Sequence, residues 1–100
     1  MSPANYKIKE NSWLARIAAK KLGKKDVAMV LGNTIHLWKT PEADFLKDEK
    51  WVKHELCHVD QYKRYGFLDF LVRYLWESMR KGYYNNKYEI EARSAEENIE

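Results

Sequence analysis

The spacing of apolar residues predicts helices over much of this chain. Apolar residues recur every three or four positions between Ser12, a good N-cap, and Gly23, which predicts a helix from about 13 to 22. A longer central helix is expected from Ala43 to Tyr65, because neither Pro nor Gly interrupts this stretch.

A β-hairpin is expected between these helices. Two β-prone runs, Val27–Leu31 and Thr34–Trp38, flank Gly32-Asn33, a pair suited to a tight turn. Alternation along the second run puts His36 on the face opposite Ile35, where it is a candidate to contact substrate.

Two further helices are expected after the central one. Residues 67–81 are apolar around the whole helix, so this aromatic helix must be buried or must contact a partner or a second copy of the chain. A last helix runs from Lys87 to about Asn98. The pattern therefore predicts one α+β domain over residues 1–100, with residues 1–11 as a disordered tail.

Composition limits the function classes. The 100 residues carry 18 Lys and Arg against 15 Asp and Glu, a net charge of +3, which is too small an excess to predict a nucleic-acid partner. No apolar stretch is long enough to span a membrane. The single cysteine cannot form an internal disulfide, so a cytoplasmic location is expected.

The strongest chemical signal is His54-Glu55-Leu56-Cys57-His58 inside the central helix. Helical geometry puts the two histidines about 40° apart on one face, so both imidazoles can reach a single zinc ion. Glu55 lies on the same side, where its carboxylate can act as general base on a zinc-activated water. Gln61, one turn beyond His58, is a candidate to orient a ligand.

A hydrolytic zinc site needs a third protein ligand, and the best candidate is Glu89. Glu91 is the alternative, and only one of the two can face a given site. Asn86 followed by Glu89 also resembles a capping box, in which the carboxylate would return to its own helix. The remaining acidic residues of the last helices are interpreted as solvated charges: Glu77, Glu91, Glu96 and Glu97.

Together these motifs resemble the gluzincin type of zinc metallopeptidase, which carries H-E-x-x-H on one helix and a glutamate ligand on a later one. Arg93 stands where that family often has aspartate. More narrowly, the chain is similar to small bacterial proteins that keep only the metallopeptidase core, on three segments: LGNTI at 31–35, HELCHVDQY at 54–62 and GYYNNKYEIEAR at 82–93.

This resemblance implies a minimal zincin fold in which His54, His58 and Glu89 bind one zinc ion and Glu55 is the base. It also implies a peptide or protein substrate lying along a sheet edge, for which the arm Asn33–Trp38 is the candidate. Candidates to contact the substrate or its oxyanion are Tyr83, Tyr84 and Tyr88, together with His36. The alternative function is a zinc-stabilised interaction module without turnover.

Overall fold

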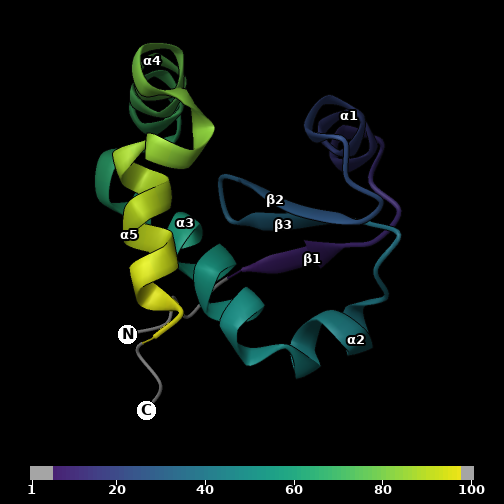
Figure 1. The fold of residues 1–100 in the computed structure, drawn as a ribbon. Helices are drawn as coiled ribbons and strands as arrows, with labels where there is room; N and C mark the ends of the chain where they lie inside the picture. The colour runs from purple at the N-terminus through teal and green to yellow at the C-terminus, as the bar shows by residue number, and fades with distance from the viewer. Residues whose placement is uncertain (1–5, 98–100) are drawn as a thin grey trace.

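The structure is a computed structural model that describes residues 6–97. This part of the chain is a small α+β fold of five helices and a three-stranded mixed sheet (Figure 1). In chain order the elements are β1 (Lys7–Lys9), α1 (Trp13–Leu22), β2 (Val27–Leu31), β3 (Thr34–Trp38), α2 (Glu42–Lys47), α3 (Glu49–Tyr65), α4 (Phe67–Asn85) and α5 (Lys87–Ala95).

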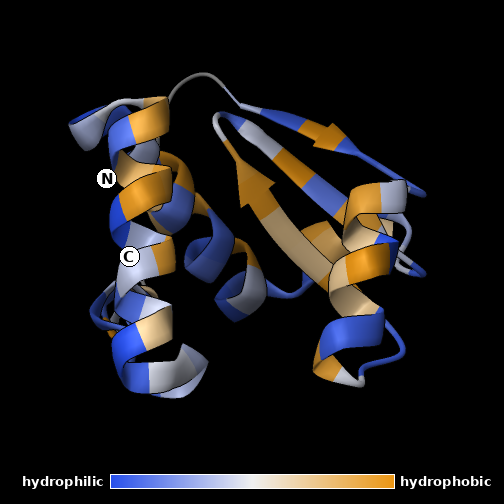
Figure 2. Cartoon of the chain, turned by 90° about the horizontal axis from the view of Figure 1, so that it is seen from above, coloured by the Kyte–Doolittle hydropathy of each residue, from blue (hydrophilic) through white to orange (hydrophobic). Residues whose placement is uncertain are grey.

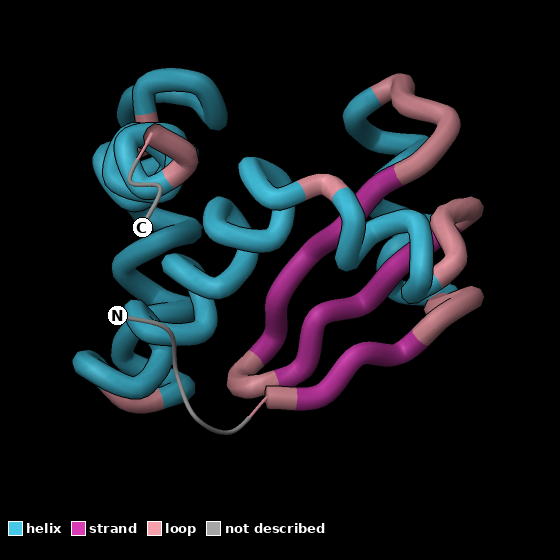
Figure 3. The backbone as a smooth tube through the Cα atoms, turned by 90° about the horizontal axis from the view of Figure 1, so that it is seen from below, coloured by secondary structure: helices cyan, strands magenta, loops and turns pink. Residues whose placement is uncertain are grey.

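The hairpin forms at the predicted bounds, with Gly32 at φ 65° in its turn. Strand β3 is central, antiparallel to β2 on one side and parallel to β1 on the other (Figure 3). Strand β2 therefore lies at the edge of the sheet.

The prediction of a tail over residues 1–11 is wrong for the part of it that the structure describes, and residues 1–5 lie outside that part. Residues 7–9 pair with β3, aligning Ile8 with Ile35, and the backbone N–H of Lys7 donates to Asn33 at 2.8 Å. A three-residue strand with one apolar side chain has too little pattern to be recognised alone.

Helices cover both faces of the sheet. Helix α1 packs its alanines, Ala15 and Ala19, against one face together with Val27. On the other face the main core joins the sheet to α2, α3, α4 and α5, through Val30, Ile35, Leu37, Phe45, Leu56, Val59, Tyr62, Phe70 and Tyr88. This core fixes α3 and α5 side by side, and the candidate site lies between them.

The helices differ from their predicted bounds in three places. The last helix ends at Ala95, short of the predicted end near Asn98, which lies outside the described residues. The central helix is broken at Asp48, whose backbone is extended (φ −91°, ψ 90°) and whose side chain accepts a hydrogen bond from the Trp51 N–H at 3.2 Å. An aspartate N-cap thus starts α3 without any Pro or Gly. The third helix bends at Gly82 (φ 83°, ψ 165°) and continues for one more turn.

Helix α4 is not buried as an all-round apolar helix would be. Only Phe70 and Glu77 are buried along it, and its other face lies in solvent. Within residues 6–97, none of the helices combines the length and the apolar character needed to cross a bilayer.

Candidate metal centre

Helix α3 presents both histidines of the motif on one face, as the spacing predicts. The ring centroids of His54 and His58 are 5.1 Å apart. His58 is buried, and the side chain of His54 is 12% exposed. Glu55 follows on the same helix and is 5% exposed.

Helix α5 brings Glu89 to these histidines. One carboxylate oxygen of Glu89 lies 3.0 Å from His54 Nε2, and the other lies 3.2 Å from His58 Nε2. The capping role falls to Asn86, whose side-chain oxygen accepts from the Tyr88 N–H at 2.8 Å. The Glu89 carboxylate is therefore used across the helix interface rather than for its own helix.

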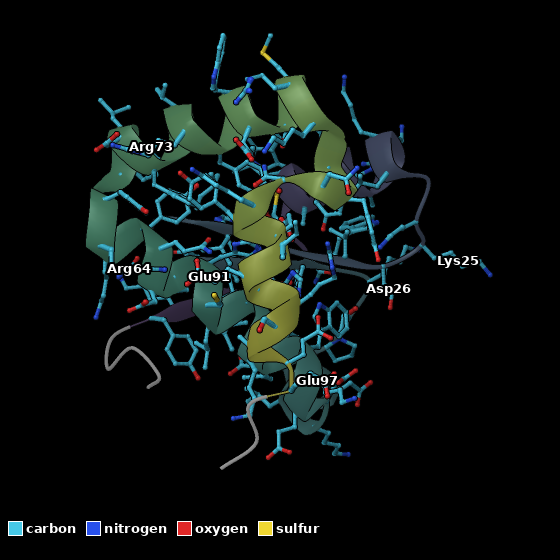
Figure 4. All side chains as sticks on the ribbon, turned by 60° about the vertical axis from the view of Figure 1, so that its left-hand side comes forward. Lys25, Asp26, Arg64, Arg73, Glu91 and Glu97 are labelled. Atoms are coloured by element: carbon cyan, nitrogen blue, oxygen red, sulfur yellow. The ribbon has the colours of Figure 1, made fainter. Side chains whose placement is uncertain are left out.

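Glu91 faces away from the histidines, so the choice between the two glutamates is decided by geometry. It accepts hydrogen bonds from Arg64 at 2.9 and 3.1 Å and from the amide of Gln61 at 2.8 Å. Figure 4 shows Arg64 and Glu91 pointing toward one another from α3 and α5. Glu91 thus ties the two helices together beside the site.

Gln61 determines the tautomer of His58. The Gln61 amide nitrogen donates to the Tyr88 carbonyl at 3.1 Å and to Glu91, both of which can only accept. Its oxygen must then be the atom that lies 2.8 Å from His58 Nδ1, so Nδ1 carries the proton. A neutral His58 consequently has its lone pair on Nε2, directed at Glu89 and His54.

His54 is held in the same way by Glu96, which is not the solvated charge that the sequence suggests. A Glu96 oxygen lies 2.6 Å from His54 Nδ1. Carboxylates and carbonyls that hold the distal nitrogen are the usual support of histidine ligands. The interpretation of Glu77 as solvated is also wrong, since it is 5% exposed and accepts from the Lys87 N–H at 3.3 Å.

Tyr74 of α4 is a contact of the site that sequence reasoning missed. Its hydroxyl donates to Glu89 Oε2 at 2.5 Å, and its ring lies edge-on to His58. Within helix 67–81 this tyrosine looks like one more aromatic residue, so only the path of α4 across α3 and α5 reveals its role.

The donor set fits a metal ion. One ligand atom from each of His54, His58 and Glu89 lies within 4.8 Å of the others. Two ligands of one tetrahedral zinc ion are about 3.3 Å apart, close to the separations of 3.0 and 3.2 Å found here. His58 Nε2 is buried without a hydrogen bond of good geometry, and a bound metal ion would satisfy it.

Burial and mutual charge shift the pKa values of these groups in the metal-free protein. Burial raises the pKa of Glu55 to about 7 against the opposing effect of the two imidazoles. Burial lowers the pKa of His54, but hydrogen bonds to Glu89 and Glu96 and the charge of Glu55 outweigh it and raise this pKa to about 9. The same histidine hydrogen bonds outweigh burial at Glu89 and hold its pKa well below the usual range.

The site opens into a cleft of about 530 Å³ between α1 and β2 on one side and α4 on the other. His54, Glu55, His58 and Glu89 all line it, and so does every residue of β2. The prediction that the arm Asn33–Trp38 offers a free edge is wrong. That arm is β3, and β1 and β2 already pair with it on both sides.

Only Tyr83 of the four substrate-contact candidates lines this cleft. Tyr88 is buried in the core between Tyr65 and Phe70, and Tyr84 is exposed with Arg93 stacked 4.0 Å from its ring centroid. His36 lies under α1, where Ser12 Oγ is 2.8 Å from its Nδ1. These three side chains are used in packing or on the surface, and the structure does not bring them to the cleft.

Comparisons with known proteins identify no relative of this chain. Neither the family models, nor the curated proteins, nor the solved structures contain a match for this chain. The residues of the site therefore carry the functional argument alone.

Proposed function

We propose that this protein is a zinc-dependent hydrolase that cleaves peptide or related amide bonds. The observation that carries the proposal is the convergence of His54, His58 and Glu89 beside a buried Glu55 at the base of a cleft. Structural zinc sites close all four positions with protein ligands, whereas this set leaves one position open, as catalysis requires.

Zinc is the metal that this donor set favours. Two imidazoles and one carboxylate bind zinc or divalent iron, whereas magnesium and calcium are held by oxygen ligands, and the buried Glu55 beside the set favours hydrolytic zinc chemistry. Glu96 and Gln61 support the assignment because each engages the Nδ1 of one histidine and leaves its Nε2 toward the common point.

Glu55 is the group suited to move protons. When bound, zinc would lower the pKa of a water molecule and polarise a substrate carbonyl. The carboxylate of Glu55 would accept a proton from that water and deliver it to the leaving amine nitrogen. Its position supports this role, because Glu55 is buried, lines the cleft and directly follows the ligand His54 in the sequence.

The edge strand β2 is the element suited to bind an extended peptide. Among the described residues no strand pairs with its outer edge, and the whole strand lines the cleft. A peptide added to that edge would hydrogen bond through its main chain, so recognition would not depend on one side chain. Tyr83 lines the same cleft and could donate its hydroxyl proton to a substrate oxygen.

The test compares metal content and peptide hydrolysis in Glu55→Gln and in Glu49→Gln, an exposed glutamate of the same helix. Glu55→Gln should keep its zinc and lose activity by about 10²- to 10⁴-fold, and Glu49→Gln should behave like the unchanged protein. If zinc-loaded protein hydrolyses no member of a peptide library, the proposal fails, and a zinc-stabilised interaction module becomes the better account.

A further inference from the structure

The exposed large hydrophobic side chains of this protein are concentrated on two helices. On α4 they include Leu68, Val72, Trp76 and Met79, which are 60 to 80% exposed, and on α1 they include Ile17 at 48%. Elsewhere in the described chain, only Leu46 and Ile90 are large, hydrophobic and exposed. Apolar area gathered in this way marks an interaction surface.

The two helices share one face of the molecule because they form opposite banks of the cleft. Leu22 of α1 and Leu75 of α4 both line the cleft and are 42% and 53% exposed, so they belong to its rim. Seen from above in Figure 2, α1 and α4 both lie toward the viewer with hydrophobic turns in sight, and the sheet lies between them. We name this surface, formed by the outer sides of α1 and α4, the cleft face.

The cleft face is bordered by positive charge. Helix α1 and the loop after it carry five exposed cations and no acidic residue between positions 11 and 25, namely Arg16, Lys20, Lys21, Lys24 and Lys25. Within residues 6–97 none of these five forms an ion pair, and Figure 4 shows Lys25 projecting away from the fold. On α4, by contrast, Arg73 is paired with Asp69 and Lys81 with Glu77.

We propose that the cleft face binds a negatively charged lipid surface, with the cleft opening onto the membrane. Amphipathic helices that lie in a membrane interface combine Trp, Phe and Leu on one side with Lys and Arg around them, as α1 and α4 do together. A second copy of the chain fits this face less well, because the acidic residues of α4 that could meet the α1 cations, Asp69 and Glu77, are already paired with Arg73 and Lys81. A nucleic acid would use the cations but not the exposed aliphatic side chains.

This proposal is independent of the hydrolase assignment, because it concerns binding alone. The experiment measures co-sedimentation of the full chain with vesicles of phosphatidylcholine, with and without an equimolar share of phosphatidylserine. Binding should require phosphatidylserine and should weaken as salt is added. Absence of binding to the anionic vesicles would overturn the proposal.

Two pairs of double variants locate the binding surface. Lys20→Gln/Lys24→Gln should lower the affinity for anionic vesicles by about tenfold, whereas Lys47→Gln/Lys50→Gln removes the same charge from α2 and the start of α3 and should not. Likewise Val72→Ser/Trp76→Ser should weaken binding, and Leu46→Ser/Ile90→Ser should not.

The same variants also distinguish a lipid surface from a second copy of the chain as the partner of the cleft face. Equal weakening by the test and control variants would show that the cleft face is not the binding surface. A concentration-dependent dimer in analytical ultracentrifugation that Val72→Ser/Trp76→Ser disrupts, without vesicle binding, would assign the face to a second copy and overturn the lipid proposal.

Discussion

The side-chain oxygen of Gln61 lies 2.8 Å from Nδ1 of His58, one turn earlier on the same helix. Gln61 is fully buried, and its amide nitrogen is held by the Tyr88 carbonyl and by Glu91. The glutamine therefore cannot turn over without losing these bonds. Its orientation keeps Nε2 of His58 as the nitrogen that faces Glu89.

Replacing Gln61 should separate metal affinity from stability. Gln61→Met removes the acceptor at His58 Nδ1, so zinc affinity should fall by about 10- to 100-fold in competition with a chelator. Gln61→Glu keeps an acceptor there but places a carboxylate against Glu91 and the Tyr88 carbonyl. It should retain zinc and lower the free energy of unfolding, which urea denaturation measures.

Equal zinc affinities in Gln61→Met and the unchanged protein would contradict this role. Leu56→Met, a buried change on the same helix that touches neither histidine nitrogen, controls for repacking alone.

Zinc binding should release protons at neutral pH. The pKa of His54 is raised to about 9 in the metal-free protein, so its imidazole is charged at pH 7 and must lose a proton before Nε2 can bind zinc. Zinc affinity should therefore rise by at least about tenfold per pH unit between pH 7 and 9, because His54 must lose a proton and the pKa of His58 is also raised, its burial being outweighed by its contact with Glu89. Calorimetry in buffers of different ionisation enthalpy counts the protons.

The metal-free protein should show the opposite pH dependence. A histidine whose pKa is raised on folding stabilises the fold fully below its unfolded pKa of 6.5, and this stabilisation is lost as the pH rises through about 9. In thermal melts, the Tm of the metal-free protein should thus fall between pH 6.5 and 9. Over the same range, the increase in Tm caused by added zinc should become larger. Glu96→Gln, which removes one partner of His54, should reduce this pH dependence.

The sequence predicts what is local and strongly patterned. The hairpin has two alternating runs around Gly32-Asn33, and the histidine pair follows from helical spacing alone. The need for a third ligand makes Glu89 the predicted residue, and its carboxylate lies 3.0 and 3.2 Å from the two histidines. The break at Asp48 has a local signal, an aspartate three residues before Trp51, but it is weaker than the uninterrupted helical composition around it.

The predictions about the free sheet edge and about Glu96 are wrong for one reason. Both depend on contacts between residues that are far apart in the sequence. Strand β1 has too few residues to be recognised, and without it nothing in the hairpin indicates which strand stays at the sheet edge. Because β1 pairs with β3, the edge strands of the sheet are β1 and β2, and of these two only β2 lines the cleft. Glu96 likewise meets His54 across 42 positions, through a crossing of α3 and α5 that no local pattern encodes.

Asn86 should be a stability-critical residue of the site. It is fully buried, it caps α5, and its amide donates to the Tyr74 carbonyl at 3.0 Å and to Ser78 at 2.8 Å. Asn86→Ala leaves these groups unpaired and should lower the free energy of unfolding by about 2 to 3 kcal/mol.

Asn86→Asp preserves the acceptor for the Tyr88 N–H but loses the two donated hydrogen bonds. Its free energy of unfolding in a urea titration should therefore lie between those of Asn86→Ala and the unchanged protein. If Asn86→Asp is as stable as the unchanged protein, the two hydrogen bonds that Asn86 donates to α4 contribute nothing to stability, and its cap of α5 is the contact that matters.

Tyr74 and Tyr83 should have different effects although both come from α4 and both line the cleft. The Tyr74 hydroxyl donates to Glu89, so Tyr74→Phe should weaken zinc binding by about tenfold while the ring keeps its contacts with His58 and Phe70. Tyr83→Phe should keep zinc and lower kcat/KM for peptide hydrolysis, because its hydroxyl is the candidate donor to the substrate oxygen. Chelator competition and peptide kinetics on both variants separate the two roles. If Tyr74→Phe binds zinc normally and Tyr83→Phe loses it, then Tyr83 rather than Tyr74 supports the metal ligand, and the assignments must be exchanged.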